Sequence, residues 1–223
     1  NVKSGRVSLE NYESTTMKLE DFRIVYDEYE NFLRRCGKID FDDMLVFTYE
    51  LLSERPDILK MWQNKFRYIL IDEFQDINMI QYDIVKLLAG ERQNVFSVGD
   101  DDQSVYGFRG AAPAIMKKFP EDFHGTVIEY LNVNYRCSYD IVECSKRIIQ
   151  NNRDRYEKQL RSAFAAGQSD RVHIVKTDSM TEQNKKIIDR ITELNRAGIP
   201  YREMAIIFRT NTEPRALASK LME

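Results

Sequence analysis

The sequence predicts an α/β fold in which helices pack against a parallel β-sheet. Two short apolar runs, residues 68–71 and 95–98, are rich in strand-forming side chains and are bounded by polar residues. Between them, apolar residues recur at helical spacing over 79–88, with Asn78 as a cap and Gly90 as a stop. A strand, helix and strand in this order favour a right-handed crossover, so the two strands should run parallel in one sheet.

Composition sets limits on the class of protein. The 223 residues are 43% hydrophobic, which is enough for a real core and argues against a wholly disordered chain. Lys and Arg number 33 against 36 Asp and Glu, a net charge of −3, so any contact with nucleic acid must be local. No apolar run approaches the roughly 20 residues that span a bilayer, and the N-terminus lacks a signal-peptide pattern. We therefore expect a soluble, cytoplasmic protein with no membrane partner.

Three helices are predicted before the first strand. One runs from Met17 to about Cys36, and Asp40 is a plausible N-cap for the second. Pro56 begins the third helix at its first turn. Asp40 and its acidic neighbours up to Asp43 are either helix-capping carboxylates or part of a functional site, and the sequence leaves both open. The three cysteines lack the paired spacing of a zinc site and are expected to be reduced thiols.

Two carboxylates, Asp72 and Glu73, directly follow the first predicted strand. In α/β proteins, ligands bind at the carboxyl edge of the sheet, where these side chains would emerge. Nucleoside triphosphatases use one such carboxylate to hold Mg²⁺ through its water shell and another to polarise the attacking water. We assign the first role to Asp72 and the second to Glu73. The alternative is that the pair only caps a helix.

The second predicted strand leads into Gly99-Asp100-Asp101-Asp102-Gln103-Ser104-Val105-Tyr106-Gly107-Phe108-Arg109-Gly110-Ala111. The amide of Gln103 could reach a terminal phosphate or the attacking water. The three adjacent aspartates point in different directions from a turn, which disfavours a metal cluster.

Tyr106, Phe108 and Arg109 form an aromatic and basic group in the same loop. Single-stranded nucleic acid stacks its bases on such rings, and arginine neutralises phosphate or stacks in turn. Tyr106 could instead be tucked under the loop, and Arg109 could pair with Asp76. Both alternatives stay open.

A third strand is predicted over 126–131, leading to Asn134-Tyr135-Arg136. The guanidinium of Arg136 suits a triphosphate, because its fork pairs with phosphate oxygens and stabilises charge that develops during transfer. Residues 151–170 should form a surface connection, with 153–161 as a solvated face. Further strands are predicted over 171–176 and 204–208, with helices over 181–196 and from Pro214 onward.

The segments DEFQD, GDDDQSVYGFRGA and NYR, in this order and at these separations, resemble the UvrD/Rep-type superfamily 1 DNA helicases. The resemblance implies that Gln103 senses the γ-phosphate and that Tyr135 stacks on the nucleotide base. It implies that Arg209 and Asn211, in the segment 208–211, contribute to the DNA channel. In the family a Trp often stands where this chain has Phe108, which offers a smaller face for stacking.

The same resemblance implies a RecA-like parallel sheet with helices on both faces, in three parts. Residues 1–38 would be the remnant of a helical subdomain, 39–133 the second half of a first RecA-like domain, and 134–223 the start of a second. It also implies ATP and Mg²⁺ as cofactors, single-stranded DNA and single-strand/double-strand junctions as partners, 3′-to-5′ unwinding, and a role in DNA repair or replication.

The chain contains no G-x-x-x-x-G-K-[ST] loop to cradle phosphates. We therefore expect this stretch to be part of a helicase that does not hydrolyse ATP appreciably by itself. Two alternatives are a nuclease-fused relative of the same superfamily and a catalytically dead module that binds DNA or protein.

Overall fold

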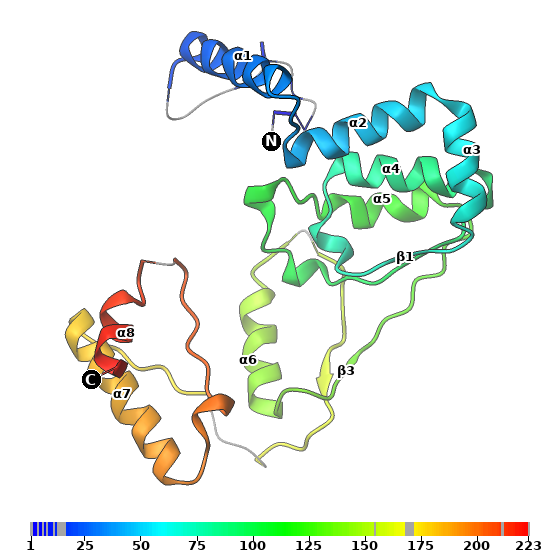
Figure 1. Ribbon diagram of the computed structural model, residues 1–223. Coiled ribbons are helices and arrows are strands. Elements are labelled where there is room, and N and C mark those ends of the chain that lie inside the picture. The colour runs from blue at the N-terminus through cyan, green and yellow to red at the C-terminus, as the bar shows by residue number, and fades with distance from the viewer. Residues whose placement is uncertain are drawn as a thin grey trace. The chain divides into compact units, whose positions relative to one another are not determined.

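A computed structural model describes residues 2–3, 5, 7, 9–10, 12, 17–153, 155–167, 172–210 and 212–222, and only the backbone of Arg109 (Figure 1). The chain divides into two compact units, residues 1–168 and 169–223. The three domains predicted from the sequence are a different division of the chain, and that division stays a prediction.

The first unit contains the predicted strand, helix and strand. Strands β1 (Ile69–Ile71) and β2 (Val95–Ser97) pair in parallel, with Ile69 opposite Val95 and Ile71 opposite Ser97. Helix α4 (Met79–Ala89) connects them, begins after Asn78 and ends at Gly90. The parallel crossover predicted from the apolar pattern is confirmed.

One face of this two-stranded sheet is covered by α4 and α5 (Ala114–Asp122) (Figure 1). The core between the layers consists of Phe74, Tyr82, Ala89, Ile115, Phe119 and Phe123. Ile69, Ile71 and Val95 of the strands pack against it. On the other face, Leu70 and Phe96 are 73% and 63% exposed. Within the described part of the chain, helices therefore cover one face of this sheet and not the predicted two.

Helices α2 (Phe41–Glu54) and α3 (Pro56–Lys65) contact α4 and form a further layer. Asp40 caps α2: its Oδ1 accepts a hydrogen bond from Asp43 N at 2.8 Å, and Asp40 N donates to Asp43 Oδ2 at 3.0 Å. The capping interpretation is thus confirmed for Asp40 and Asp43, although Asp43 is buried and not solvated. Helix α1 (Leu19–Arg35) precedes this layer and has no buried residue.

A second parallel pair follows, made of β3 (Val133–Asn134) and β4 (Arg161–Ser162), with α6 (Tyr139–Ile149) between them. The prediction of a strand over residues 126–131 is wrong. These residues form no strand, and Val127 and Leu131 are exposed. Apolar alternation alone does not make a strand, because the backbone also needs a hydrogen-bonding neighbour.

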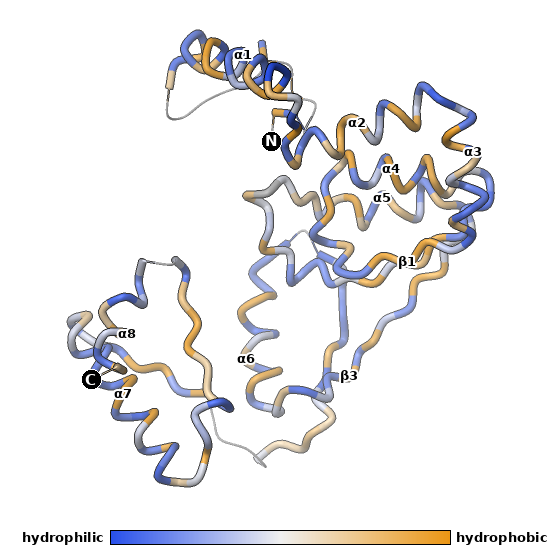
Figure 2. Tube along the Cα trace, in the orientation of Figure 1, coloured by the Kyte–Doolittle hydropathy of each residue, from blue (hydrophilic) through white to orange (hydrophobic). Residues whose placement is uncertain are grey.

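The second unit contains α7 (Met180–Arg196) and α8 (Arg215–Met222). Residues 172–176 and 204–208 belong to no strand, so the prediction of strands there is also wrong for the residues described. Figure 2 shows the second of these stretches as an apolar run before α8. Among the described helices, none is long and apolar enough to cross a membrane.

Candidate functional site

Glu73 lies in a strained backbone conformation at the end of β1. Its φ and ψ of 49° and 45° are left-handed, a region that costs a residue other than glycine about 1–2 kcal/mol. The next residue, Phe74, is buried in the core, and its N–H donates to Val98 O at 2.9 Å. Core packing and this hydrogen bond therefore hold the turn that projects Glu73 from the sheet edge.

Gln75 orients the Glu73 carboxylate from inside the protein. It lies in the short 3₁₀ helix Phe74–Asp76, and only 1% of it is exposed. Its Nε2 donates to Glu73 Oε2 at 2.7 Å, and its Oε1 accepts a hydrogen bond from Asp100 N at 3.0 Å. A single buried amide thus connects the loops that follow β1 and β2. Gln75 is not among the site residues predicted from the sequence, although it lies within the DEFQD segment.

Gly99 leaves the room that this amide needs. A Cβ at this position would lie 2.9 Å from Gln75 Oε1, 3.1 Å from Phe74 Cβ and 3.2 Å from Phe74 N. The first distance is shorter than real Cβ contacts, and both neighbours are buried. Glycine is therefore required by close packing of the two loops.

Asp100 extends the connection to the predicted phosphate sensor. Its Oδ2 accepts a hydrogen bond from Gln103 Nε2 at 2.8 Å, and its Oδ1 accepts one from Asp102 N at 3.2 Å. Glu73, Gln75, Asp100 and Gln103 therefore form one hydrogen-bonded chain, which we call the Gln75 network. It brings together two of the residues predicted from the sequence, Glu73 and Gln103.

Asp72 is exposed at the same edge of the sheet. Its Oδ1 accepts a hydrogen bond from Glu73 N at 2.9 Å, and Oδ2 has no hydrogen bond to any residue described. A solvent-accessible carboxylate oxygen is the kind of ligand that Mg²⁺ prefers. The residue present therefore fits the predicted metal role.

The aromatic loop exposes most of one aromatic residue. Phe108 is 73% exposed and Tyr106 40%, and their ring centroids are 5.9 Å apart at an interplanar angle of 45°. Proteins that bind single-stranded nucleic acid stack bases on exposed rings of this kind. The structure describes the backbone of Arg109, in the 3₁₀ helix Gly107–Arg109, but not its side chain.

Tyr135 and Arg136 lie in the turn between β3 and α6, and both side chains are exposed. Asn134 Oδ1 shapes the turn by accepting hydrogen bonds from Arg136 N at 2.9 Å and Cys137 N at 2.7 Å. In the part of the chain described, no side-chain contact joins Tyr135 or Arg136 to the Gln75 network. Their roles at a shared triphosphate stay predictions.

Arg209 belongs to the second unit, where it is exposed and its backbone N donates to Glu213 Oε2 at 3.2 Å. The predicted DNA-contacting Asn211 lies outside the described residues. Neither observation tests the predicted roles of these residues in DNA binding.

Residues 155–158 lie against the three aspartates, so the prediction of a solvated face over 153–161 is wrong for this part. Lys158 forms ion pairs with Asp100, Asp101 and Asp102, and Arg155 pairs with Asp102. The side chains of Lys158 and Arg155 are each only 19% exposed. The expectation that the three carboxylates point in different directions is wrong, because their oxygens lie within 4.8 Å of one another and all three contact Lys158.

These contacts shift the pKa values of Asp100, Asp102 and Lys158. The hydrogen bonds from Arg155 hold the pKa of Asp102 below its usual value, against the effect of burial. Burial would raise the pKa of Asp100, but the hydrogen bonds from Lys158 and Gln103 outweigh it and lower the pKa. Burial would likewise lower the pKa of Lys158, and the three carboxylates together raise it. All three groups therefore keep their charges over a wide pH range.

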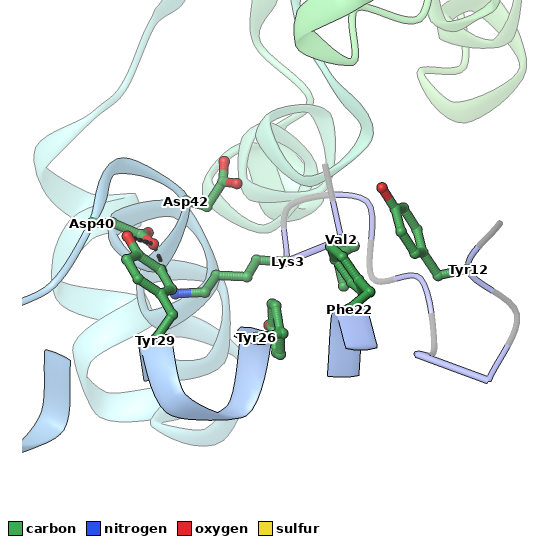
Figure 3. A pocket seen from close by; sticks show the side chains of 8 residues that line it. All are labelled: Val2, Lys3, Tyr12, Phe22, Tyr26, Tyr29, Asp40 and Asp42. Atoms are coloured by element: carbon green, nitrogen blue, oxygen red, sulfur yellow. Dashed lines mark hydrogen bonds and ion pairs between the residues drawn. The ribbon is translucent and has the colours of Figure 1, made fainter. Parts of the chain in front are cut away.

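A separate hollow of about 250 Å³ lies by α1 and the start of α2 (Figure 3). Lys3 reaches across it, and its ammonium group contacts Asp40 at 2.8 Å, Asp43 at 2.7 Å and also Glu30. The pKa of Lys3 is raised because these carboxylates outweigh the effect of burial. The hollow is lined by Asp40 and Asp42, for which the sequence leaves a functional role open, and Asp40 already pairs with Lys3.

Comparisons with known proteins identify the family. The family model described as the UvrD/REP helicase N-terminal domain matches residues 1–124. The model described as the UvrD-like helicase C-terminal domain matches residues 129–223. Asp72, Glu73 and Gln103 fall within the first match, and Arg136 and residues 155–158 within the second.

Individual relatives agree with these matches. The protein YjcD of Bacillus subtilis (strain 168) is 39% identical over 197 residues, which is 88% of this chain and 26% of YjcD. The ATP-dependent DNA helicase PcrA of Staphylococcus epidermidis (strain RP62A) is 37% identical over 199 residues, 89% of this chain and 27% of PcrA. PcrA of Staphylococcus aureus (strain Mu50) is 36% identical over 211 residues, 95% of this chain and 29% of PcrA.

The chain thus spans between 26% and 29% of the length of these curated relatives. A RecA-like α/β fold, as these domains imply, agrees with the parallel β1 and β2 and their crossover helix. The domain matches and the ordered motifs together show that the chain belongs to the UvrD/REP helicase family.

Proposed function

We propose that this chain is part of an ATP-dependent DNA helicase that moves along single-stranded DNA and unwinds duplexes in the 3′-to-5′ direction. The observation that carries the proposal is the Gln75 network. Glu73 is held in a strained turn at the sheet edge by a buried amide, and the same amide is connected through Asp100 to Gln103. Strained backbone held by its surroundings is typical of active sites.

In this proposal Glu73 polarises the water that attacks the terminal phosphate of ATP. Gln75 keeps the Glu73 carboxylate in one orientation, so no reorganisation is needed when the water binds. Gln103 contacts the γ-phosphate. Arg136 pairs with phosphate oxygens and Tyr135 stacks on the base. Asp72 would hold Mg²⁺, which neutralises phosphate charge when bound.

The proposed DNA contacts lie on loops. Phe108 and Tyr106 would stack on bases, and Arg109, Arg209 and Asn211 would contact the strand. The exposed ring of Phe108 supports this assignment. Junctions between single-stranded and double-stranded DNA are the proposed substrates, in DNA repair or replication and in the cytoplasm.

The division into a helical remnant over 1–38 and two RecA-like parts over 39–133 and 134–223 is part of the same proposal. We also propose that residues 1–223 alone lack appreciable ATPase activity, since they contain no phosphate-cradling glycine loop. Experiments on activity therefore require the full-length protein that contains this chain.

The central test is DNA-stimulated ATP hydrolysis by the full-length protein and its Glu73→Gln variant. Glutamine keeps the size and a hydrogen-bonding oxygen but cannot act as a base, so kcat should fall about 100-fold or more. Glu91→Gln is the matched control, because Glu91 is also an exposed glutamate of the same unit. A Glu73→Gln variant with the kcat of the unmodified protein would show that Glu73 is not the activating carboxylate.

Direction is tested with duplexes that carry a single-stranded tail. Unwinding of a 3′-tailed duplex, with little unwinding of a 5′-tailed one, is the expected result. The reverse preference would contradict the proposed direction. If an ATPase-active protein unwound neither duplex, only the translocation part of the proposal would remain.

A further inference from the structure

Three consecutive carboxylates after β2 form ion pairs with two cations that lie more than 50 residues later in the sequence. Arg155 donates to Asp102 through Nε at 2.7 Å and Nη2 at 2.5 Å, a bidentate pair. Lys158 contacts Asp100 and Asp101 and lies 2.9 Å from Asp102. We call these five residues the aspartate cluster.

Tyr156 also holds residues 155–158 in place, through its backbone N–H and its hydroxyl group. Tyr156 N donates to Asp101 Oδ2 at 2.6 Å, and Tyr156 Oη donates to Met116 O at 2.9 Å. The segment is thus anchored both on the aspartates and on α5. Ion pairs that are mostly shielded from solvent and hydrogen-bonded on several sides are screened far less than surface pairs.

Asp100 belongs to both the aspartate cluster and the Gln75 network. Its Oδ1 contacts Lys158 and its Oδ2 accepts a hydrogen bond from Gln103. Its backbone N donates to Gln75, which orients Glu73. The position of Lys158 therefore bears on the orientation of Gln103 and, through Gln75, of Glu73.

Asp100 and Lys158 also lie in stretches that are matched by two different family models. Asp100 lies in the stretch matched by the N-terminal domain model and Lys158 in the stretch matched by the C-terminal one. We propose that Lys158 is a positioning residue for ATP hydrolysis, which acts through its contact with Asp100 on Gln103 and, by way of Gln75, on Glu73. This inference rests on the proposed function of the Gln75 network.

Steady-state ATP hydrolysis by the full-length protein, with single-stranded DNA present, tests the coupling. Lys158→Gln should lower kcat about tenfold and leave the KM for ATP within about twofold, because orientation and not binding is lost. Lys158→Arg keeps the charge and should restore most of kcat. Arg155→Gln is the matched control: Arg155 is equally buried and belongs to the same cluster but pairs with Asp102 and not Asp100, so kcat should stay within about twofold.

Equal losses in Lys158→Gln and Arg155→Gln would overturn the inference, because they would mean that the cluster only stabilises the fold. An unchanged kcat in Lys158→Gln would overturn it too. Failure of the proposed function is distinguishable, since the unmodified protein itself would then show no DNA-stimulated hydrolysis.

A second variant covers the case in which Lys158→Gln does not fold, as judged by circular dichroism. Asp100→Asn removes the charge that Lys158 contacts and keeps an oxygen that can accept from Gln103. It should reproduce the kcat loss, and the double variant with Lys158→Arg should lose no more than Asp100→Asn alone. Wild-type kcat in Asp100→Asn, or an additive loss in the double variant, would contradict the coupling.

Discussion

Single residues at the sheet edge are fixed by contacts that leave little freedom. Gln75 is the clearest case, since one buried amide donates to Glu73 and accepts from Asp100. An amide is the side chain that can do both at once, whereas a carboxylate in its place would face Glu73 with a like charge. The strain at Glu73 and the absence of a Cβ at Gly99 are further parts of the same arrangement.

Gly99→Ala should destabilise the protein by about 1–3 kcal/mol, the usual range for overpacking a tight site. The added methyl group would push against Gln75 Oε1 and Phe74, which are buried and cannot swing away. Thermal unfolding of the full-length protein measures the loss. Gly125→Ala, at a glycine with open space around it but a positive φ of 80°, shows the cost of backbone strain alone.

In the proposed DNA-binding role, Phe108→Ala should weaken binding of single-stranded DNA by about 1–3 kcal/mol, the usual contribution of one base stacked on an aromatic ring. Binding of nucleotide should be unaffected, since Phe108 is outside the Gln75 network. Fluorescence anisotropy with a labelled oligonucleotide and nucleotide titration separate the two effects. Equal losses of both affinities would indicate that the ring packs instead of stacking.

Elements form where local and tertiary signals agree. The parallel pair β1 and β2 was predictable because an apolar run, a capped helix and a second apolar run leave few other arrangements. Residues 126–131 carry a similar pattern but have no partner strand, so they stay unpaired. The contact between residues 100–102 and 155–158 could not be predicted from local sequence patterns, because it joins residues up to 58 positions apart. Sequence alone placed the acidic pair and Gln103 at one edge but could not place the cations.

The aspartate cluster should stabilise the protein most between about pH 5 and pH 9. Asp100 and Asp102 have a folded-state pKa below the value of roughly 3.9 in an unfolded chain, so their contribution is lost as the pH falls through the folded pKa. Lys158 has a folded-state pKa above the roughly 10.4 of an unfolded chain, so its contribution is lost only as the pH rises beyond that.

The measurement is the difference in thermal midpoint between the full-length protein and Lys158→Gln from about pH 3 to pH 11. The difference should be constant in the middle of this range and shrink at both ends. A difference in thermal midpoint that shrinks at neither low nor high pH would mean that the ion pairs contribute nothing to stability.

At the scale of the whole molecule, one sheet face and several extended runs carry exposed apolar side chains. Leu70 and Phe96 lie on the face opposite α4 and α5, and Ile174 and Ile207 are almost fully exposed in the second unit. Apolar surface of this kind favours association with other surfaces. Residues 1–223 by themselves should therefore bind a hydrophobic dye, and Leu70→Glu should reduce that signal without unfolding α4, since Leu70 does not belong to the core.

Dye fluorescence and circular dichroism check this expectation. Ile69→Glu is the contrasting variant, because Ile69 packs against the core and its replacement should disrupt the fold. Equal dye fluorescence and equal helix content in the two variants would contradict the assignment of one sheet face to the core and the other to solvent.

The aspartate cluster has a consequence for the approach of any polyanion. Three aspartates alone would present a charge of −3 beside the Gln75 network, and the two cations reduce it to −1. Removing Lys158 would therefore raise an electrostatic barrier toward phosphates at short range, one that added salt would lower by screening.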